Sequence, residues 1–250
     1  MFIKGLVIKF VKNFIQKNKL LEKWYGIRPE TKEFYSQFGE DASLQTFFSN
    51  QEWTKEKKAA EIPKGFYVDI GCYNPIEISN TYWFFKRGWK GINVDLSTEA
   101  IAAFNNARPN DINLVAAITN SEAVSEIDFF EFGLSSVYNT LDEESARQTQ
   151  KTQGLTPVKR KIQSMGLNHL FEKHLPEGQE ISFLSVDAEG HDLEILKSNN
   201  WTKYKPKAIV VEIHEPNFHS LGKNEVIQFL EGKGYVIYSW LNPSVILVIN

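Results

Sequence analysis

The sequence predicts an α/β fold with a mostly parallel sheet, helices on both faces of the sheet and an antiparallel hairpin at the C-terminal end. After residue 60, short apolar runs alternate with segments of helical length. This order is typical of parallel sheets. The last two apolar runs flank Asn242-Pro243-Ser244, a turn sequence that predicts the hairpin. The composition is that of a globular protein, with 42% hydrophobic and 24% charged residues.

Each element is predicted from its local pattern, in chain order. Strands are expected over 64–70, 91–95, 112–117, 127–131, 181–186, 208–213, 235–240 and 245–249. Helices are expected over 80–87, from a cap at 97 or 98 to about 107, over 190–199 and over 224–232. Ser97 or Thr98 can cap the second of these helices, because their hydroxyls accept hydrogen bonds from its first N–H groups. The polar stretch 139–157 is interpreted as either a loop or a helix.

Length and charge narrow the classes of protein that remain. A chain of 250 residues suits one large domain. The single cysteine, Cys72, excludes a disulfide framework within one chain and a cysteine-based zinc site, and it fits a cytoplasmic location. The net charge of −3 gives no sign of the basic surface that binds nucleic acid, so no nucleic-acid partner is expected. The oligomeric state is not predicted.

The chain is expected to have three parts: a basic amphipathic helix over 1–22, a helical lead-in or lid over 23–60, and the α/β domain over 61–250. Residues 1–21 contain five lysines and no acid. Lysines interrupt their helically spaced apolar residues, which excludes a transmembrane helix and a signal peptide. Two interpretations stay open. The helix lies on the anionic inner face of the membrane, or it packs on protein.

The carboxyl ends of the first two strands carry the chemistry expected of a ligand site. The first strand ends at Asp69 and Gly71, and Gly71 allows a ligand to approach the backbone. The dinucleotide fingerprint G-x-G-x-x-G is absent, because Tyr73 and Ile76 stand at its later glycine positions. Asp95, 26 positions after Asp69, can accept both hydroxyl hydrogens of a ribose. An acid without a pyrophosphate cradle favours a nucleoside without a diphosphate, such as S-adenosylmethionine.

Four segments together resemble the FkbM family of S-adenosylmethionine-dependent methyltransferases. They are SQFGEDASL (36–44), GFYVDIGCYNP (65–75), SNTYWFFKRGWKGINVD (79–95) and FLSVDAEGHDLEIL (183–196). The resemblance implies the seven-stranded Rossmann-like methyltransferase fold, with its last strand antiparallel. It also implies O-methylation. Similar proteins belong to bacterial polysaccharide and natural-product pathways, so a sugar or glycan acceptor in polysaccharide biosynthesis is expected. Cys72 and Asp192 depart mildly from the family pattern.

The resemblance also assigns expected roles to individual residues. Asp69 and Gly71 match the motif for the amino-acid end of the cofactor, and Asp95 matches the ribose acid. Side chains expected to line the cofactor site in addition are Asn74, Asn80, Gln37, Glu40 and Ser136. For Glu40, an acid that merely stabilises the first turn of a helix is the alternative.

A catalytic base is expected at the ends of the later strands. The candidates are Asp187, Glu189 and His214, and Asp187 can instead hold the acceptor or the cofactor ammonium. His214 has a purely structural alternative, and His191 is expected on the surface. Asp187, Glu189, Glu212 and His214 form an oxygen-rich set, so a divalent cation on Asp187, Glu212 and His214 is a further hypothesis. A nicotinamide-dependent sugar oxidoreductase and a catalytically inactive membrane-associated scaffold remain as alternatives.

Overall fold

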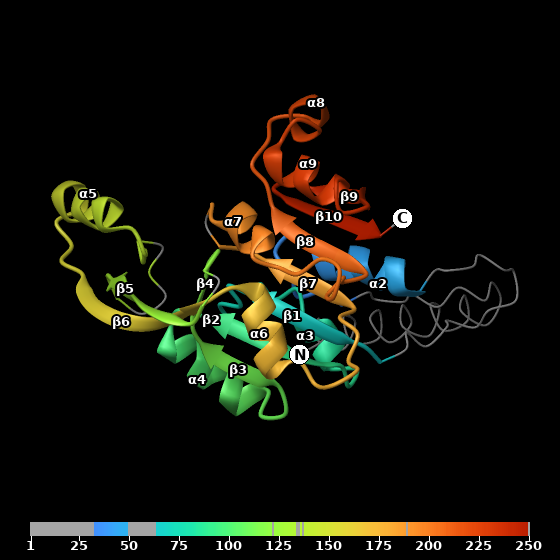
Figure 1. The fold of residues 1–250 in the computed structure, drawn as a ribbon, viewed down its shortest axis with the longest axis horizontal. Coiled ribbons are helices and arrows are strands. Elements are labelled where there is room, and N and C mark those ends of the chain that lie inside the picture. The colour runs from blue at the N-terminus through green and yellow to red at the C-terminus, as the bar shows by residue number, and fades with distance from the viewer. Residues whose placement is uncertain are drawn as a thin grey trace, which may run out of the picture. The chain divides into compact units, whose positions relative to one another are not determined.

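A computed structural model gives the fold of the chain (Figure 1). It describes residues 33–49, 64–121, 123–133, 136, 138–188 and 190–249. Residues 34–250 group into one compact unit. The helix predicted over 1–22 lies outside the described residues, as does most of the lead-in predicted over 23–60. Among the described helices, none has the length and apolar character needed to cross a membrane.

Within the described part of the chain, seven strands form the main sheet, in the order β3-β2-β1-β7-β8-β10-β9. The strands are β1 (Phe66–Ile70), β2 (Lys90–Asp95), β3 (Ile112–Val115), β7 (Phe183–Val186), β8 (Ala208–Glu212), β9 (Tyr235–Leu241) and β10 (Ser244–Ile249). The pairs from β3 to β8 are parallel, whereas β10 is antiparallel to both β8 and β9. The predicted fold class and its C-terminal hairpin are therefore confirmed.

The main sheet is buried on both faces because helices cover both of them. Every residue of β1 and β7 is buried, as expected for parallel strands with apolar side chains on each side. Val68 and Ile70 pack in one cluster with Leu170, Ile195 and Leu230. Tyr67, which points the other way, packs in a second cluster with Leu44, Phe84 and Phe183.

The helices that contribute to these layers match the predictions in part. They are α2 (Glu40–Ser49), α3 (Tyr82–Phe85), α4 (Thr98–Ala107), α6 (Leu167–His174), α7 (Asp192–Lys197), α8 (Phe218–Leu221) and α9 (Glu225–Glu231). Ser97 caps α4, as one of the two predicted alternatives, and accepts from Ala100 N at 3.2 Å. The helix predicted over 80–87 is shorter than expected, and α6 and α8 were not predicted.

A small second sheet, in the order β4-β6-β5, corrects the prediction for residues 112–165. Its strands are β4 (Ala117–Ile118), β5 (Ser125–Glu131) and β6 (Val158–Met165), and helix α5 (Glu143–Gln153) lies between β5 and β6 in the chain. The strand predicted over 112–117 breaks at Ala116, where the chain leaves the main sheet. The strand predicted over 127–131 is present, but it pairs with β6.

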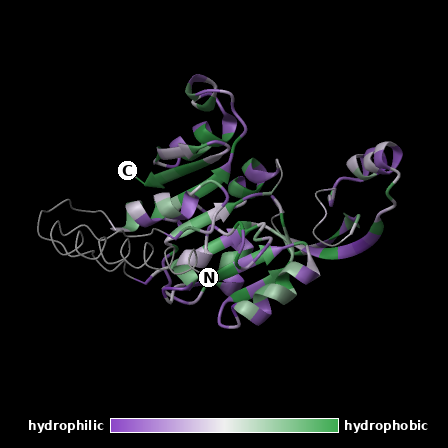
Figure 2. Ribbon diagram, turned by 180° about the vertical axis from the view of Figure 1, so that it is seen from behind, coloured by the Kyte–Doolittle hydropathy of each residue, from purple (hydrophilic) through white to green (hydrophobic). Residues whose placement is uncertain are grey.

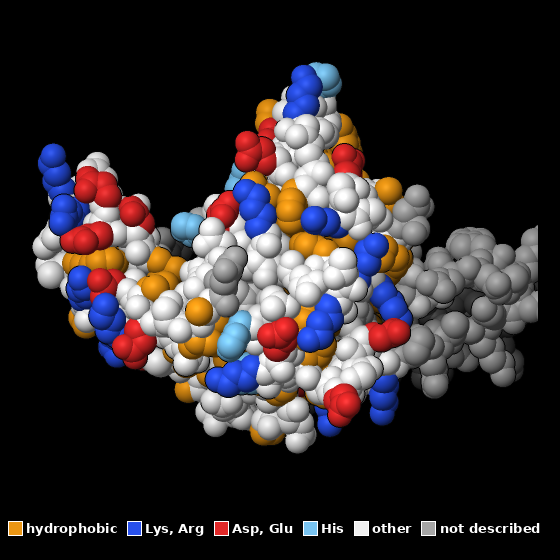
Figure 3. Space-filling view, viewed as in Figure 1, with side chains coloured by type: hydrophobic (Ala, Val, Ile, Leu, Met, Phe, Trp, Pro, Cys, Tyr) orange, Lys and Arg blue, Asp and Glu red, His pale blue; other side chains and the backbone are white. Residues whose placement is uncertain are grey.

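Strand β6 is not predicted from the sequence because its first half is charged and exposed. Lys159 and Lys161 both form ion pairs with Asp128 of β5, at 3.0 and 2.8 Å. In Figure 2, β6 and α5 carry much hydrophilic purple, while the strands of the main sheet are largely green. In Figure 3, basic and acidic side chains are interleaved over α5, β5 and β6. Such a strand lacks the alternation from which strands are predicted.

Candidate functional site

A cavity of about 450 Å³ opens at the carboxyl ends of the parallel strands. Its walls come from the turns after β1, β2 and β7, from residues 116–118, and from the segment that leads into α5. The strand order reverses between β1 and β7, and open α/β sheets bind ligands at such a switch point. Five of the predicted site residues line this cavity: Gln37, Gly71, Asp95, Ser136 and Asp187.

Gly71 is required by a close backbone approach between the ends of β1 and β7. Its φ is +78°, and a Cβ atom at this position would lie 1.9 Å from the Asp187 carbonyl oxygen. The Gly71 N–H also donates to the Val94 carbonyl at 2.9 Å. The glycine therefore closes the base of the cavity and brings the turns after three strands together.

Asp95 ends β2 and is held rigidly by the backbone. Its Oδ2 accepts from Tyr73 N at 2.9 Å, and its Oδ1 accepts from Ser97 N at 2.8 Å. Burial raises the pKa of the Asp95 carboxyl, and the backbone hydrogen bonds oppose that rise. Each oxygen keeps lone-pair capacity, so the carboxylate can still accept the two hydroxyls of a ribose.

The turn after β1 is tied down by its own side chains. Asn74 Oδ1 accepts from Ile76 N and Glu77 N at 2.9 and 3.0 Å, so the side chain shapes the turn. Tyr73 and Ile78 have positive φ values of 50° and 54°. Among the described contacts, the Tyr73 N–H is the only N–H of this turn that donates to a carboxylate of the site. The turn thus supports Asp95 and offers no glycine-rich cradle for a pyrophosphate.

Asp69 and Asn80 lie behind the cavity wall and do not line the cavity. Asp69 is 5% exposed and accepts from the Thr81 hydroxyl at 3.0 Å. Burial raises the pKa of the Asp69 carboxyl, and the positive charge of Arg108 opposes that rise. Asn80 donates from Nδ2 to Ser185 Oγ at 3.1 Å. In this structure both side chains hold strands and turns together from within.

Gln37 and Glu40, the two residues predicted in a lid, take different positions. Gln37 is exposed and lines the cavity. Glu40 is 2% exposed, and its two oxygens accept from Phe38 N at 2.8 Å and from Ser244 Oγ at 2.6 Å. Glu40 therefore joins the start of α2 to β10, a contact that neither prediction for this residue included.

His214 and Glu212 lie away from the cavity lining. The His214 side chain is 78% exposed, and its Nε2 lies 3.1 Å from Glu212 Oε1. Glu189 lies outside the described residues. Among the described residues, no group of three or more His, Cys, Asp or Glu side chains is placed to hold a metal ion. The hypothesis of a cation on Asp187, Glu212 and His214 therefore gains no support from the geometry.

Two parts of the lining were missed by sequence reasoning. His191, expected on the surface, is exposed but also lines the cavity, next to the end of β7. Asn139, Thr140 and Leu141 line it from the segment before α5, close to the predicted Ser136. The polar stretch FGLSSVYN could have indicated this wall, but nothing local shows that the segment folds back toward the main sheet.

A sheet of this order, with its last strand reversed and an acid after the second strand, defines a Rossmann-like methyltransferase fold. Residues 69–237, about two thirds of the chain, match the methyltransferase FkbM domain. The protein belongs to the FkbM methyltransferase family and is a methyltransferase. The match begins at Asp69, so it does not cover Gln37 and Glu40. No curated protein sequence matches the chain.

Proposed function

We propose that this methyltransferase moves a methyl group from S-adenosylmethionine to a hydroxyl of a sugar in bacterial polysaccharide or glycan biosynthesis. The main support for this cofactor is the position of Asp95, which two backbone N–H groups hold at the edge of a cavity of about 450 Å³. When bound, the cofactor supplies an electrophilic methyl group. Asp95 would hold its ribose, and the apolar side chains Leu96 and Ile118 would flank its base.

The residues present fit an adenosyl cofactor better than a nicotinamide dinucleotide. A dinucleotide needs a glycine-rich turn whose N–H groups contact the pyrophosphate. Here Tyr73 and Ile76 occupy that turn, and the Pro75 carbonyl of the same turn accepts a hydrogen bond from Arg108 Nε. The cavity therefore offers a carboxylate for a diol and no matching site for two phosphates.

A thermal-shift experiment tests the cofactor. S-adenosylmethionine, S-adenosylhomocysteine and NAD are added separately to the full chain. A ligand at about 100 times its dissociation constant stabilises a fold by roughly 2.7 kcal/mol, which is a shift of several degrees for a chain of this size. Shifts with the two adenosyl ligands alone support the proposal. A shift with NAD alone, or no shift with any of the three ligands, would contradict S-adenosylmethionine as the cofactor.

The sugar acceptor is supported by neutral polar residues in the cavity lining. Gln37, Ser136, Asn139 and Thr140 are neutral side chains with hydroxyl or amide groups. Such groups can exchange hydrogen bonds with several hydroxyls of an uncharged polyol. Asp187, at the end of β7, would bind either an acceptor hydroxyl or the cofactor ammonium. Transfer of labelled methyl to methyl glycosides, compared with simple alcohols and hydroxylated peptides, tests this choice of acceptor.

We also propose that residues 1–21 contact an anionic membrane at the inner face of the cell. The support is their sequence, with five lysines and interleaved apolar residues. Flotation with vesicles of anionic lipid tests it, using the full chain and a chain without residues 1–21. Binding of the full chain alone is the expected result. Equal binding of both chains would remove the idea.

A further inference from the structure

His191 brings an imidazole to the cavity that the proposed roles do not use. It precedes the first residue of α7, follows the end of β7 and lines the cavity together with Asp187. Among the described lining residues, it is the only histidine. His214, the histidine predicted as base, lies outside that lining and is 78% exposed.

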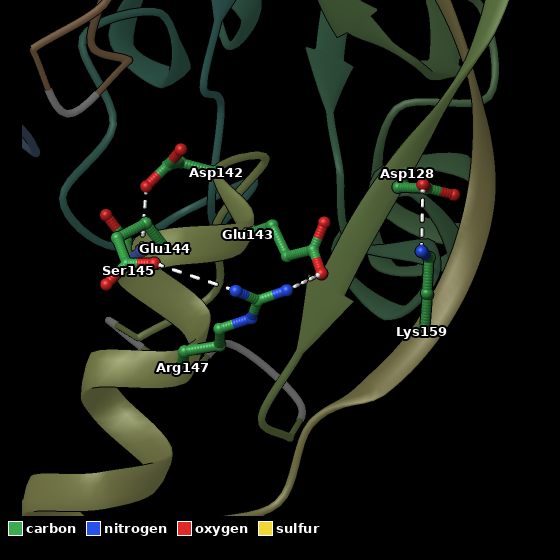
Figure 4. Close-up of polar contacts among 7 residues, drawn as sticks. All are labelled: Asp128, Asp142, Glu143, Glu144, Ser145, Arg147 and Lys159. Carbon is green, nitrogen blue, oxygen red and sulfur yellow. Dashed lines mark hydrogen bonds and ion pairs between the residues drawn. The ribbon is translucent and has the colours of Figure 1, made fainter.

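Asp142 adjoins the segment of the cavity wall that faces the site from the start of α5. It directly follows Thr140 and Leu141, which line the cavity, and it caps α5. Its Oδ2 accepts from Ser145 N at 2.7 Å, and Figure 4 shows the other carboxylate oxygen pointing away from α5. The hydrogen bond from Ser145 is the main cause that lowers the pKa of Asp142, and the positive charge of a protonated His191 lowers it further. Since Thr140, Leu141 and His191 line the same cavity, an acid at 142 and the imidazole adjoin the same space.

We propose that His191 is the catalytic base for the acceptor hydroxyl and that Asp142 is its charge partner. This inference rests on the proposed function. The acceptor oxygen forms a bond to the methyl carbon while the carbon–sulfur bond breaks and its electron pair stays on sulfur. The hydroxyl proton passes to an imidazole nitrogen of His191 and then to water. Asp142 acts as a positioning residue, since it stabilises the imidazolium without touching the acceptor.

The surroundings of His191 favour this role. The acids that line the cavity are Asp95 and Asp187, and the described lining contains neither lysine nor arginine. Asp192, the next residue, is buried and accepts from Ala188 N at 3.0 Å, so its carboxyl closes the turn rather than facing the acceptor. Within the described lining, a positive charge formed on the imidazole therefore has two carboxylates and no lysine or arginine beside it.

An imidazole also suits the chemistry better than the neighbouring carboxylates. Histidine in general titrates near 6.5 and aspartate near 3.9, so imidazole is the stronger base at neutral pH. A positioned general base contributes about 10²–10⁴-fold to a rate. The turn after β7 would thus supply the proton acceptor, while Asp95 serves cofactor binding alone.

The kinetic test compares His191→Asn with the matched variant His214→Asn. Labelled methyl transfer to methyl glycosides is measured from pH 5.5 to 9, and S-adenosylhomocysteine binding is measured by calorimetry. In His191→Asn we expect kcat to fall about 10²–10⁴-fold, with cofactor affinity changed less than about two-fold. In His214→Asn we expect kcat to stay near the wild-type value. Asp142→Asn should lower kcat less and move the acid limb of the pH profile, and Asp142→Glu should restore it.

A second measurement is independent of turnover. The carboxyl carbon of Asp142 is followed by NMR as pH is lowered, in the wild-type chain and in both histidine variants. His191→Asn should raise the pKa of Asp142, because the imidazolium that lowers it is gone. His214→Asn should leave it unchanged.

The outcomes separate this inference from the proposed function. Normal turnover in His191→Asn overturns the pairing. So does an Asp142 pKa that is the same in His191→Asn as in the wild type. A wild-type chain that binds S-adenosylhomocysteine but methylates only other alcohols defeats the sugar proposal, and the same variants on that alcohol then decide the base. A wild-type chain that binds no adenosyl ligand defeats the proposed function and the base together, even if the carboxyl titration shows the pair.

Discussion

Arg108 Nη1 lies 2.8 Å from the hydroxyl of Thr81, which in turn donates to the Asp69 carboxylate at 3.0 Å. Arg108 is fully buried, and it also donates to the Pro75 carbonyl and to Ser79 Oγ. One side chain from the end of α4 thus fixes the turn after β1 and balances the buried acid beneath it. The cavity wall depends on this chain of contacts although no part of it touches the cavity.

Replacing Arg108 by Met should therefore be strongly destabilising. The change leaves Asp69 buried without a balancing charge and leaves the Pro75 carbonyl without a donor. We expect a loss of about 3–5 kcal/mol in the free energy of unfolding, measured with urea. The control is Arg147→Met, since Arg147 is exposed and pairs with Glu143 on the surface of α5 (Figure 4). That variant should lose less than about 1 kcal/mol, and similar losses in both would contradict the role of Arg108.

Gly71→Ala should be far more harmful than Gly178→Ala. Both glycines have positive φ, +78° and +72°, so both variants incur the strain of a left-handed alanine, about 1–2 kcal/mol. Only at Gly71 would the new Cβ meet backbone, the Asp187 carbonyl at 1.9 Å, whereas Gly178 has open space. Urea unfolding and S-adenosylhomocysteine binding measure the difference. Equal losses would show that backbone conformation alone explains the glycine.

Glu40→Ala should reduce stability and spare the cofactor. Both carboxylate oxygens are used, by Phe38 N and Ser244 Oγ, and none lines the cavity. We expect a loss of about 1–3 kcal/mol, the typical cost of a broken buried hydrogen bond to a charged group. Calorimetry with S-adenosylhomocysteine should give the wild-type affinity below the melting temperature. A loss of affinity greater than about ten-fold would restore the predicted role of Glu40 in cofactor binding.

Asp95→Asn should weaken S-adenosylhomocysteine binding by roughly 1.5–3 kcal/mol, the value of a hydrogen bond to a charged group. The variant should also change how stability depends on pH. Because burial raises the pKa of Asp95 in the folded chain above the ordinary 3.8, its contribution to stability is fully present below that value and is lost as pH rises through the folded pKa. The wild type should therefore lose stability relative to the variant as pH rises from 4. A constant difference would contradict the raised pKa.

The sequence predicts the main sheet well because its strands are continuous apolar runs that end in polar turns. Phe183–Val186 and Ala208–Glu212 need no partner information to be recognised. The small sheet is different. Its strand β6 is stabilised by ion pairs with β5, and a charged strand has no signal of its own until its partner is known.

For the site, positions at strand ends were predictable, and the direction of each side chain was not. Asp95 and Gly71 follow from the pattern of strand, glycine turn and acid. Asp69 matches the pattern of a site acid equally well, yet it lies within the buried strand β1, where the charge of Arg108, 39 positions further along the chain, balances it. His191 shows the reverse, because its place in the lining depends on the turn between β7 and α7.

The two walls of the cavity belong to parts of the chain with different freedom to change. Gly71 and Asp95 sit on the main sheet, where a substitution disturbs several strands at once. Ser136 to Leu141 belong to an excursion that leaves after β4 and returns through β6, and its strands pair with none of the main-sheet strands. Because the two sheets share no strand pairing in the described part of the chain, that excursion can change in length or sequence without breaking a main-sheet pair. Under the proposed function, exchanging residues 125–165 for those of a relative would change the acceptor while Gly71 and Asp95 stay in place.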